Sequence, residues 1–440
     1  MRLLIKNVDA ITLDPAGTIL RGTNIAIEDN VIRVIGDVPP DFRADETIDG
    51  YNHVAVPGFF NAHCHSPMTF ERGWAEDLPL DRWFNERIWV AESALTSEDV
   101  YWGAALAACE MIRSGCVAFN DHYFYMDRVA EVVAQSGMKA ALTWCQFGIG
   151  ADKEVGANLS ETLAFVDRWQ GQADGRIHTV LGPHSPYVCP PGFLREVSAL
   201  ARGHHLPLHI HLSESPEQME HSLKQHGLTP TALLEACGVF DVPCIVAHAL
   251  YLTDDDITIL ARRGATVAQC PITYMKLAMG VNDLSKVMGA GVNVALGTDG
   301  PGSNSDMDMK AVIRFAPLLQ KHHTRNAEAL PGDAPLRMAT ANGARAMGFP
   351  NSGTLAVGQA ADITLFDFDQ PHLYPRHDLV ANLVHSARGS DVSHVIVDGK
   401  LIYRTGELLT LDEEKIKAEA ERHAKRMVGQ SMKIVREYKG

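Results

Sequence analysis

Short apolar runs separated by turn-forming residues occupy the first fifty positions, which is the pattern of short β-strands. The runs lie at 3–5, 10–13, 19–27 and 31–35, and the same pattern returns at 353–366 and 392–403. Strands at opposite ends of a chain need partners for their edges, and pairing with each other is the simplest solution. We therefore expect one small β-sandwich domain built from residues 1–55 and 350–410.

The long middle of the chain, residues 56–349, alternates apolar strand-like runs with segments of helical period. Strand candidates lie at 54–60, 117–120, 140–144, 178–181, 207–212, 244–248, 266–270 and 292–296, and helical segments include 97–114, 159–169, 191–202, 229–237 and 254–263. Repeated strand–helix alternation imposes right-handed crossovers and a parallel sheet. Eight units over roughly 250 residues predict a (β/α)8 TIM-type barrel, an α/β fold inserted into the β domain.

The alternative sheet topology and the C-terminal segment complete the expected organisation of the chain. An open doubly wound sheet is the alternative to the barrel, but no Gly-x-Gly-x-x-Gly motif follows an early strand, so its nucleotide-binding form lacks support. Residues 411–440 are charged with scattered apolar positions, which predicts an amphipathic C-terminal helix packed on the β domain.

Composition and charge exclude several classes of protein. Hydrophobic residues make up 46% and charged residues 21% of the chain, as in folded globular proteins. Acidic residues outnumber basic ones by 54 to 39 and basic runs are short, which argues against a nucleic-acid partner. The eight cysteines lack Cys-x-x-Cys spacing, which is typical of buried thiols in a reducing compartment. With no signal-like or membrane-spanning apolar segment, we expect a cytoplasmic protein without a membrane partner.

Candidate metal ligands stand where the predicted barrel strands end, and that is where barrel enzymes carry their functional residues. His63 and His65 are two apart on extended backbone, so both imidazoles face the same side. Alone, this pair is weak evidence for a metal site and is more typical of ordinary polar loop histidines. His211, His248 and Asp299 at three other strand ends change the interpretation, because imidazoles with a carboxylate form a ligand set for a divalent ion such as zinc or iron.

These residues together resemble the amidohydrolase superfamily over nearly the whole chain. The resemblance rests on the segment 57–65 (Pro-Gly-Phe-Phe-Asn-Ala-His-Cys-His), on His211 and His248, and on Thr298-Asp299. It implies that His63, His65, His211 and Asp299 bind the metal, and that His248 orients the water held by the metal. Binuclear members usually carry a bridging lysine on strand four, and residues 176–184 contain none. We therefore expect one divalent ion, zinc by preference, with iron or manganese as alternatives.

The predicted reaction is the hydrolytic deamination of a heteroaromatic ring. Glu214, three residues after His211, matches the proton-shuttling carboxylate of the mononuclear aminohydrolases; a solvated loop glutamate is the alternative interpretation. A divalent ion lowers the pKa of bound water from about 15.7 towards 7. Asp299 can accept the proton released on attack, protonated Glu214 can donate to a ring nitrogen, and His248 can stabilise the new oxygen. The His-x-Glu and Pro-Cys-x-x-Cys motifs of the other zinc deaminases are absent.

Two loops resemble a narrower subgroup, which contains the methylthioadenosine and S-adenosylhomocysteine deaminases and the triazine hydrolases. The segments 67–83 and 182–187 carry this resemblance. It implies that Trp83 packs on a planar ring and that His184 contacts a polar substituent or ribose, while core packing is the alternative for Trp83. Ser303, in a segment expected first to cap a helix, is a further candidate to face the substrate.

One departure from this subgroup affects the expected substrate. Members that act on adenosylhomocysteine carry arginines at the end of strand three and in the loop after it, suited to a carboxylate. Here the strand ends at 142–146 without arginine, and the loop 150–158 offers only Lys153. We therefore expect a neutral adenosine-type nucleoside such as 5'-methylthioadenosine, which would release ammonia.

Several functions stay open from the sequence. Metal-assisted hydrolysis also suits a chlorohydrolase or aminohydrolase acting on a triazine, pterin, guanine or pyrimidine. A catalytically inactive metal-binding homologue is a lower-ranked alternative. The resemblance further implies a homo-oligomer, either a dimer or a tetramer, and a small heteroaromatic amine as the only partner.

Overall fold

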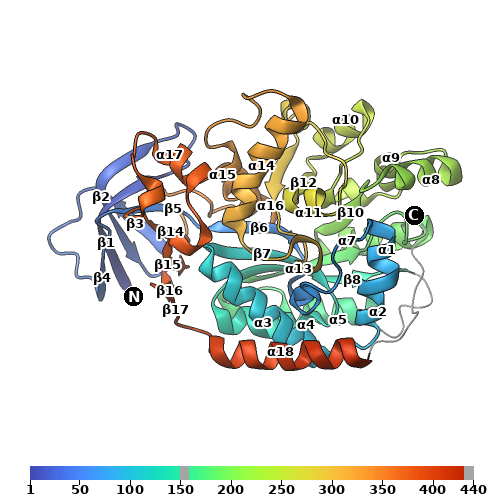
Figure 1. The fold of residues 1–440 in the computed structure, drawn as a ribbon, viewed down its shortest axis with the longest axis horizontal. Helices are drawn as coiled ribbons and strands as arrows, with labels where there is room; N and C mark the ends of the chain where they lie inside the picture. Colours follow the sequence, from blue (N-terminus) through green and yellow to red (C-terminus); the bar gives the residue numbers. More distant parts are fainter. Residues whose placement is uncertain (149–157, 431–440) are drawn as a thin grey trace.

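Eight parallel strands form the centre of the molecule, which we describe from a computed structural model over residues 1–148 and 158–430 (Figure 1). In chain order the strands are β6 (Phe59–Cys64), β7 (Cys116–Tyr123), β8 (Lys139–Gln146), β9 (Ile177–Pro183), β10 (Leu208–Leu212), β11 (Cys244–His248), β12 (Thr266–Gln269) and β13 (Asn293–Leu296). Each strand pairs in parallel with the next one along the chain. The predicted (β/α)8 barrel is confirmed.

The barrel closes where β13 meets β6. The Asp299 amide donates to the His63 carbonyl over 3.0 Å, and the Thr298 amide donates to Asn61 Oδ1 over 3.0 Å. Gly297 permits this approach, because a Cβ there would lie 2.6 Å from the His63 carbonyl oxygen. Closure therefore brings the first and eighth strands, and the ligand candidates on them, side by side.

The strand predicted at 54–60 is wrong in its boundaries. Residues His53–Pro57 form β5, which belongs to the second sheet, and the barrel strand begins only at Phe59. Gly58 lies between the two and packs closely on β7, where a Cβ would lie 2.2 Å from Val117 Cγ1. As a result His63 lies inside β6, and only His65 lies beyond its end.

Helices surround the barrel and connect its strands. The helices of ten or more residues are α3 (Ser97–Arg113), α4 (Met126–Ser136), α5 (Leu159–Trp169), α7 (Pro191–His204), α8 (Pro216–His226), α10 (Asp254–Arg263), α14 (Met309–Thr324) and α18 (Glu413–Gln430). The shorter helices are α1 (Leu80–Trp83), α2 (Trp89–Glu92), α6 (Gln172–Gly175), α9 (Pro230–Ala236), α11 (Pro271–Lys276), α12 (Leu284–Gly289), α13 (Pro301–Asn304), α15 (Ala334–Met338), α16 (Ala341–Ala346) and α17 (Leu379–Ala381). Within the described residues, none of them has the length and apolar character needed to cross a bilayer.

A second sheet joins the two ends of the chain, as predicted for the fold. Its strands are β1 (Arg2–Ile11), β2 (Ile19–Glu28), β3 (Val31–Ile35), β4 (Glu46–Asp49), β5 (His53–Pro57), β14 (Ile363–Asp367), β15 (Val392–Val397), β16 (Lys400–Arg404) and β17 (Glu407–Leu408). The junction is the antiparallel pair β5 and β14. The sheet encloses its own apolar core, which includes Ile5, Ile27 and Ile363. The domain limits at residues 55, 350 and 410 stay a prediction.

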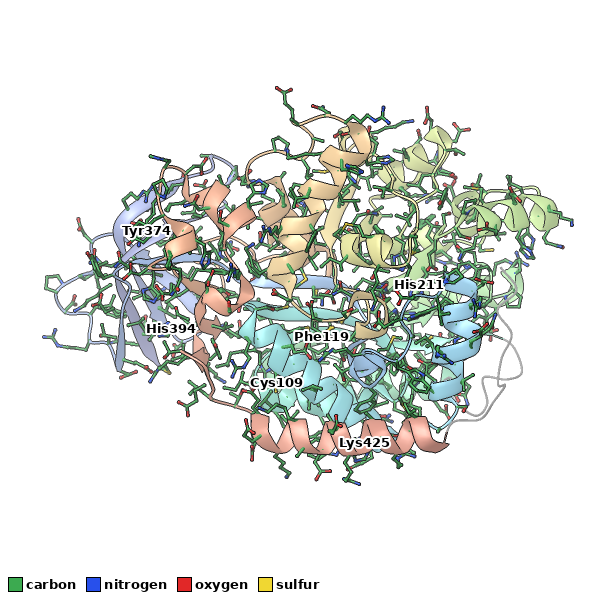
Figure 2. The ribbon with its side chains drawn as sticks, in the orientation of Figure 1. Cys109, Phe119, His211, Tyr374, His394 and Lys425 are labelled. Atoms are coloured by element: carbon green, nitrogen blue, oxygen red, sulfur yellow. The ribbon has the colours of Figure 1, made fainter. Side chains whose placement is uncertain are left out.

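A buried ion cluster attaches this sheet to the base of the barrel. Lys139, the first residue of β8, lies 2.5 Å from Asp362 Oδ2 and 2.8 Å from Asp398 Oδ1. Asp362 also accepts a hydrogen bond from the Ser352 hydroxyl. The sheet therefore lies at the end of the barrel where the strands begin, and Figure 2 shows His211 far from His394 of β15.

The C-terminal helix α18 packs on the barrel helix α3, and not on the β domain as expected (Figure 1). Lys425 on its outer face projects away from the barrel (Figure 2). On the inner face, His423 Nδ1 lies 2.6 Å from Asp99 Oδ1, and Arg426 donates to the other Asp99 oxygen. Asp99 thereby anchors α18 while its side chain also accepts from the Thr96 amide in the capping box of α3. Residues 431–440 of the predicted helix lie outside the described residues.

We expect Asp99→Ala to lower the free energy of unfolding by about 3 kcal/mol, because it leaves buried donors without their acceptor. Burial alone would raise the pKa of Asp99, but hydrogen bonds from Arg426, Thr96 and His423 hold it below its usual value. Its contribution is therefore present above the ordinary carboxyl pKa and is lost as the pH falls through the lowered one. Urea unfolding between pH 7 and pH 3 measures both effects.

The neighbouring Glu98→Ala is the matched control. Glu98 is 56% exposed and pairs with Arg128 on the surface, so its loss is expected to cost about 1 kcal/mol or less. Equal destabilisation by the two variants would contradict the anchoring role of Asp99.

Candidate functional site

Two histidines of the candidate site come from β6. His63 is fully buried inside the strand, and His65 follows the end of the strand. The two rings are 4.8 Å apart between centroids. His65 is oriented by its Nδ1, which donates to the His122 carbonyl over 2.5 Å. The alternation of side chains along an extended strand explains why residues two apart share this interior position.

The other ligand candidates lie at the ends of β10, β11 and β13. His211 donates from Nδ1 to the His184 carbonyl over 2.8 Å. His248 and Asp299 have left-handed backbones, with φ of +73° and +66°. Such conformations cost about 1–3 kcal/mol each and persist only where neighbours hold them. Here the side-chain amide of Gln269 donates from Nε2 to the His248 carbonyl over 2.5 Å. The backbone amide of Asp299 donates to the carbonyl of His63 on β6.

The five side chains lie close together in two overlapping groups. Asp299 Oδ1 lies 3.5 Å from His63 Nε2 and 3.3 Å from His65 Nε2. His65 Nε2 lies 3.3 Å from His211 Nε2. Two overlapping sets, one of His63, His65 and His211 and one of His63, His248 and Asp299, each place their ligand atoms within 4.8 Å of one another.

The donor set fits a divalent metal ion. Among the described residues His63 Nε2 is buried without a hydrogen-bond partner, which is expected of a nitrogen that binds an ion. Burial lowers the pKa of His63 to about 3 and that of His211 well below its usual value, so both rings are neutral, which is the form that binds metals. Burial alone would raise the pKa of Asp299, but His63 and His248 hold it below its usual value, so this carboxylate is ionised.

Glu214 lies beside this centre in a buried position. Its Oε2 is 3.8 Å from His248 Nε2, and the Tyr187 hydroxyl donates to its Oε1. The Glu214 amide donates to Gln218 Oε1 over 2.8 Å, which fixes the residue after β10. Burial raises the pKa of Glu214 above its ordinary value, against the opposing effects of His248 and Tyr187. The carboxyl group therefore holds its proton more readily than an exposed glutamate does.

A cavity opens beside these residues. Asp299, His211, His248 and Glu214 line its floor. Aromatic rings form much of the remaining wall, namely Trp83, Phe84, Trp89, Tyr123, Phe124 and Phe147. No lysine or arginine of the described residues lines the cavity. Its aromatic wall suits a small planar molecule.

The three predicted substrate contacts all line this cavity. Trp83 donates from Nε1 to the Gly302 carbonyl over 3.3 Å, which holds the indole in place. His184 stacks between Phe147 and His211, at centroid distances of 5.0 Å and 4.5 Å. Ser303 donates to the Gly300 carbonyl over 3.0 Å. Helix α14 is capped by Asp308, so capping by the segment 303–306 is wrong.

Several residues around the site were not predicted. Glu92 lines the cavity and accepts from the Tyr123 hydroxyl over 2.7 Å, but nothing in its local sequence distinguishes it from a surface helix residue. Tyr187 lies in the segment 182–187 without a predicted role. His209 lies 3.0 Å from His63, and its position two residues before His211 on one strand is a signal that could have placed it inside the barrel.

The chain matches a known protein family. The model of the amidohydrolase family matches residues 54–402, which is more than half of the chain. The chain belongs to the amidohydrolase family. The match spans the barrel and part of the β domain, so the resemblance noted in the sequence is confirmed.

Similar amidohydrolases include proteins of known name and structure. A 5-methylthioadenosine/S-adenosylhomocysteine deaminase from Dictyoglomus thermophilum is 45% identical over 98% of this chain and 100% of its own length. An adenosine deaminase from Xanthomonas campestris with bound zinc superposes with a TM-score of 0.91 at 32% identity, covering 97% of this chain and 98% of its own. A zinc-complexed atrazine chlorohydrolase from Arthrobacter aurescens TC1 superposes at 0.87 with 22% identity over 96% and 100%, a likeness of fold alone. Membership of this family, together with the His and Asp donor set, indicates a divalent metal ion.

Proposed function

We propose that this chain is a metal-dependent deaminase of an adenosine-type nucleoside, with 5'-methylthioadenosine as the favoured substrate and ammonia as a product. The observation that carries the proposal is the convergence of the metal-ligand set with a buried Glu214, whose pKa burial raises, at the floor of an aromatic cavity. The name of the relative from Dictyoglomus thermophilum, 5-methylthioadenosine/S-adenosylhomocysteine deaminase, supports this proposal.

The proposed cofactor is one zinc ion, held by His63, His65, His211 and Asp299. The zinc named for the adenosine deaminase from Xanthomonas campestris supports this choice over iron or manganese. When bound, zinc would act as a Lewis acid and make water nucleophilic at neutral pH. A single ion is proposed because β9, the fourth barrel strand, contains no lysine to bridge a second one.

Three side chains would move or hold protons during the reaction. Asp299, ionised and in contact with the histidines, is placed to accept the proton that water loses on attack. Glu214, whose pKa is raised by burial, would donate in its protonated form to a ring nitrogen so that no negative charge accumulates in the ring. His248, 3.8 Å from Glu214, would then stabilise the new oxygen until ammonia leaves.

The cavity wall supports a nucleoside substrate. Trp83 and its neighbouring rings would stack against the planar base, and His184 would contact a polar substituent or the ribose. Glu92, held by Tyr123, adds a hydrogen-bond acceptor suited to hydroxyl groups. Ser303 lies at the same wall and is proposed as a further contact.

We expect metal-loaded protein to release ammonia from 5'-methylthioadenosine with a kcat/KM at least about 10-fold above that for S-adenosylhomocysteine. The reason is that no cation of the described cavity residues can pair with the amino-acid carboxylate, which a bidentate arginine would otherwise bind. The loop 150–158 with Lys153 lies almost entirely outside the described residues. Steady-state ammonia release over a matched series of both nucleosides and adenosine measures the ratio.

The same assay includes guanine, a pterin, a pyrimidine and an aminated or chlorinated triazine as comparison substrates. Faster turnover of any of these than of the nucleosides would contradict the proposed substrate class. Absence of ammonia release from every compound would instead support a metal-binding homologue without catalysis.

The proposal also includes a cytoplasmic location and a homo-oligomer, either a dimer or a tetramer. All eight cysteines are buried and free, which is typical of a reducing compartment. Light scattering of the purified protein measures the number of subunits.

A further inference from the structure

The three histidines proposed as ligands differ in what their second nitrogen contacts. His65 and His211 each donate from Nδ1 to a backbone carbonyl, the first over 2.5 Å and the second over 2.8 Å. A carbonyl only accepts, so these contacts leave Nε2 free to bind an ion. His63 differs, because its Nδ1 faces another imidazole, His209 Nε2, at 3.0 Å. That partner is able either to donate or to accept.

The protons of this pair can be assigned if His63 binds an ion. The metal would take the lone pair of His63 Nε2, which leaves the proton of His63 on Nδ1 as a donor. His209 Nε2 must then be the acceptor, and the proton of the neutral His209 ring lies on Nδ1. Both rings are fully buried, which favours the neutral form with one proton each. The tautomer of His209 thus determines whether His63 presents a lone pair or a proton to the site.

The surroundings of His209 are consistent with this assignment. It lies on β10, two residues before His211, and its ring contacts His63 edge to face at a centroid distance of 4.9 Å. On its other side it meets the His122 ring at 5.2 Å and 76°. Its Nδ1 has no hydrogen-bond partner within residues 1–148 and 158–430, so among these residues the contact with His63 is the one that determines its tautomer.

We propose that His209 is a positioning residue that accepts the Nδ1 proton of His63 and so holds His63 as a metal ligand. The role rests on the proposed function only in requiring a metal ion at this site. Partners of metal-bound histidines of this kind typically contribute about 10- to 100-fold to metal affinity. Loss of this contact is therefore expected to weaken metal retention, an effect that can be measured without following the reaction.

The test compares two substitutions with zinc-loaded protein. His209→Leu fills much of the ring volume without an acceptor, whereas His209→Gln keeps an oxygen that can accept from His63. We expect His209→Leu to release zinc to a chelating indicator about 10- to 100-fold faster than the wild type, and His209→Gln to stay near the wild-type rate. His209→Met, flexible and also without a suitable acceptor, repeats the test should the leucine variant fail to fold.

A matched control is His178→Leu. His178 lies on the neighbouring strand β9, donates from Nδ1 to the Met347 carbonyl over 3.1 Å and stacks on Phe349, away from the metal ligands. We expect it to change thermal stability without changing the rate of zinc release. Thermal unfolding of each zinc-free variant separates loss of packing from loss of the ligand contact.

The outcomes distinguish this role from the proposed function. A wild-type protein that takes up no zinc contradicts the proposed function and the role of His209 together. A wild type that retains zinc, with a leucine variant that retains it equally well, contradicts the role of His209 alone. Equally fast release from the leucine and glutamine variants would also overturn it, because the acceptor would then not matter.

Discussion

Glu214→Gln is expected to retain the metal ion and to lose turnover by about 10²- to 10⁴-fold. Glutamine keeps the size of the side chain and the contact with Tyr187, but it has no acidic proton to donate to a ring nitrogen. Glu214 is not among the proposed ligands, so metal binding does not depend on it. Ammonia release and metal content per chain, measured on the same sample, test both statements.

Glu217→Gln is the matched control for this substitution. Glu217 is three residues further along the chain and is exposed at the start of α8. Its substitution replaces a carboxylate by an amide, as in Glu214→Gln, but away from the cavity floor. We expect full activity from it. Full activity in Glu214→Gln would remove the proposed acid, and loss of metal together with activity would assign Glu214 to the ligand set instead.

His211→Ala is expected to lose both the metal and the activity. Loss of a partner behind a ligand already costs about 10- to 100-fold in metal affinity, so loss of a direct ligand should cost more than about 100-fold. The substitution also removes the ring that stacks at 4.5 Å on His184 and at 5.5 Å on His248. Elemental analysis after dialysis, followed by the ammonia assay with and without added zinc, measures the effect.

His204→Ala controls for the loss of a histidine as such. His204 is exposed in the last turn of α7, and we expect neither metal content nor activity to change. Stoichiometric metal in dialysed His211→Ala, or full activity of the wild type in excess chelator, would contradict the proposed metal centre.

The barrel and its ligand candidates could be predicted because their signals are local. A strand buried on both faces, such as Cys244–His248, is a short apolar run followed by a polar residue, and this pattern needs no knowledge of the rest of the chain. Parallel strands then bring their ends to one side by geometry. His211, His248 and Asp299 could be grouped for this reason, although the roles assigned to them stay a prediction.

Other features depend on contacts between distant residues and could not be predicted. The break at Gly58 falls where β5 pairs with β14 and β6 pairs with β7, and the packing of α18 depends on Asp99, more than 300 residues from His423. Glu92 is a helix residue by its local pattern, and only the folded chain turns it into the cavity. The contact between His63 and His209 joins strands 146 residues apart.

By itself, the sequence determined the order of strands and helices and the residue types at the strand ends, because alternation of apolar and polar side chains is set by each segment alone. The tertiary structure decided which nitrogen of each imidazole faces the centre, how deeply Glu214 is buried, and how wide the cavity is. These properties arise from the closure of the barrel, where the distances between side chains depend on the packing of every strand at once.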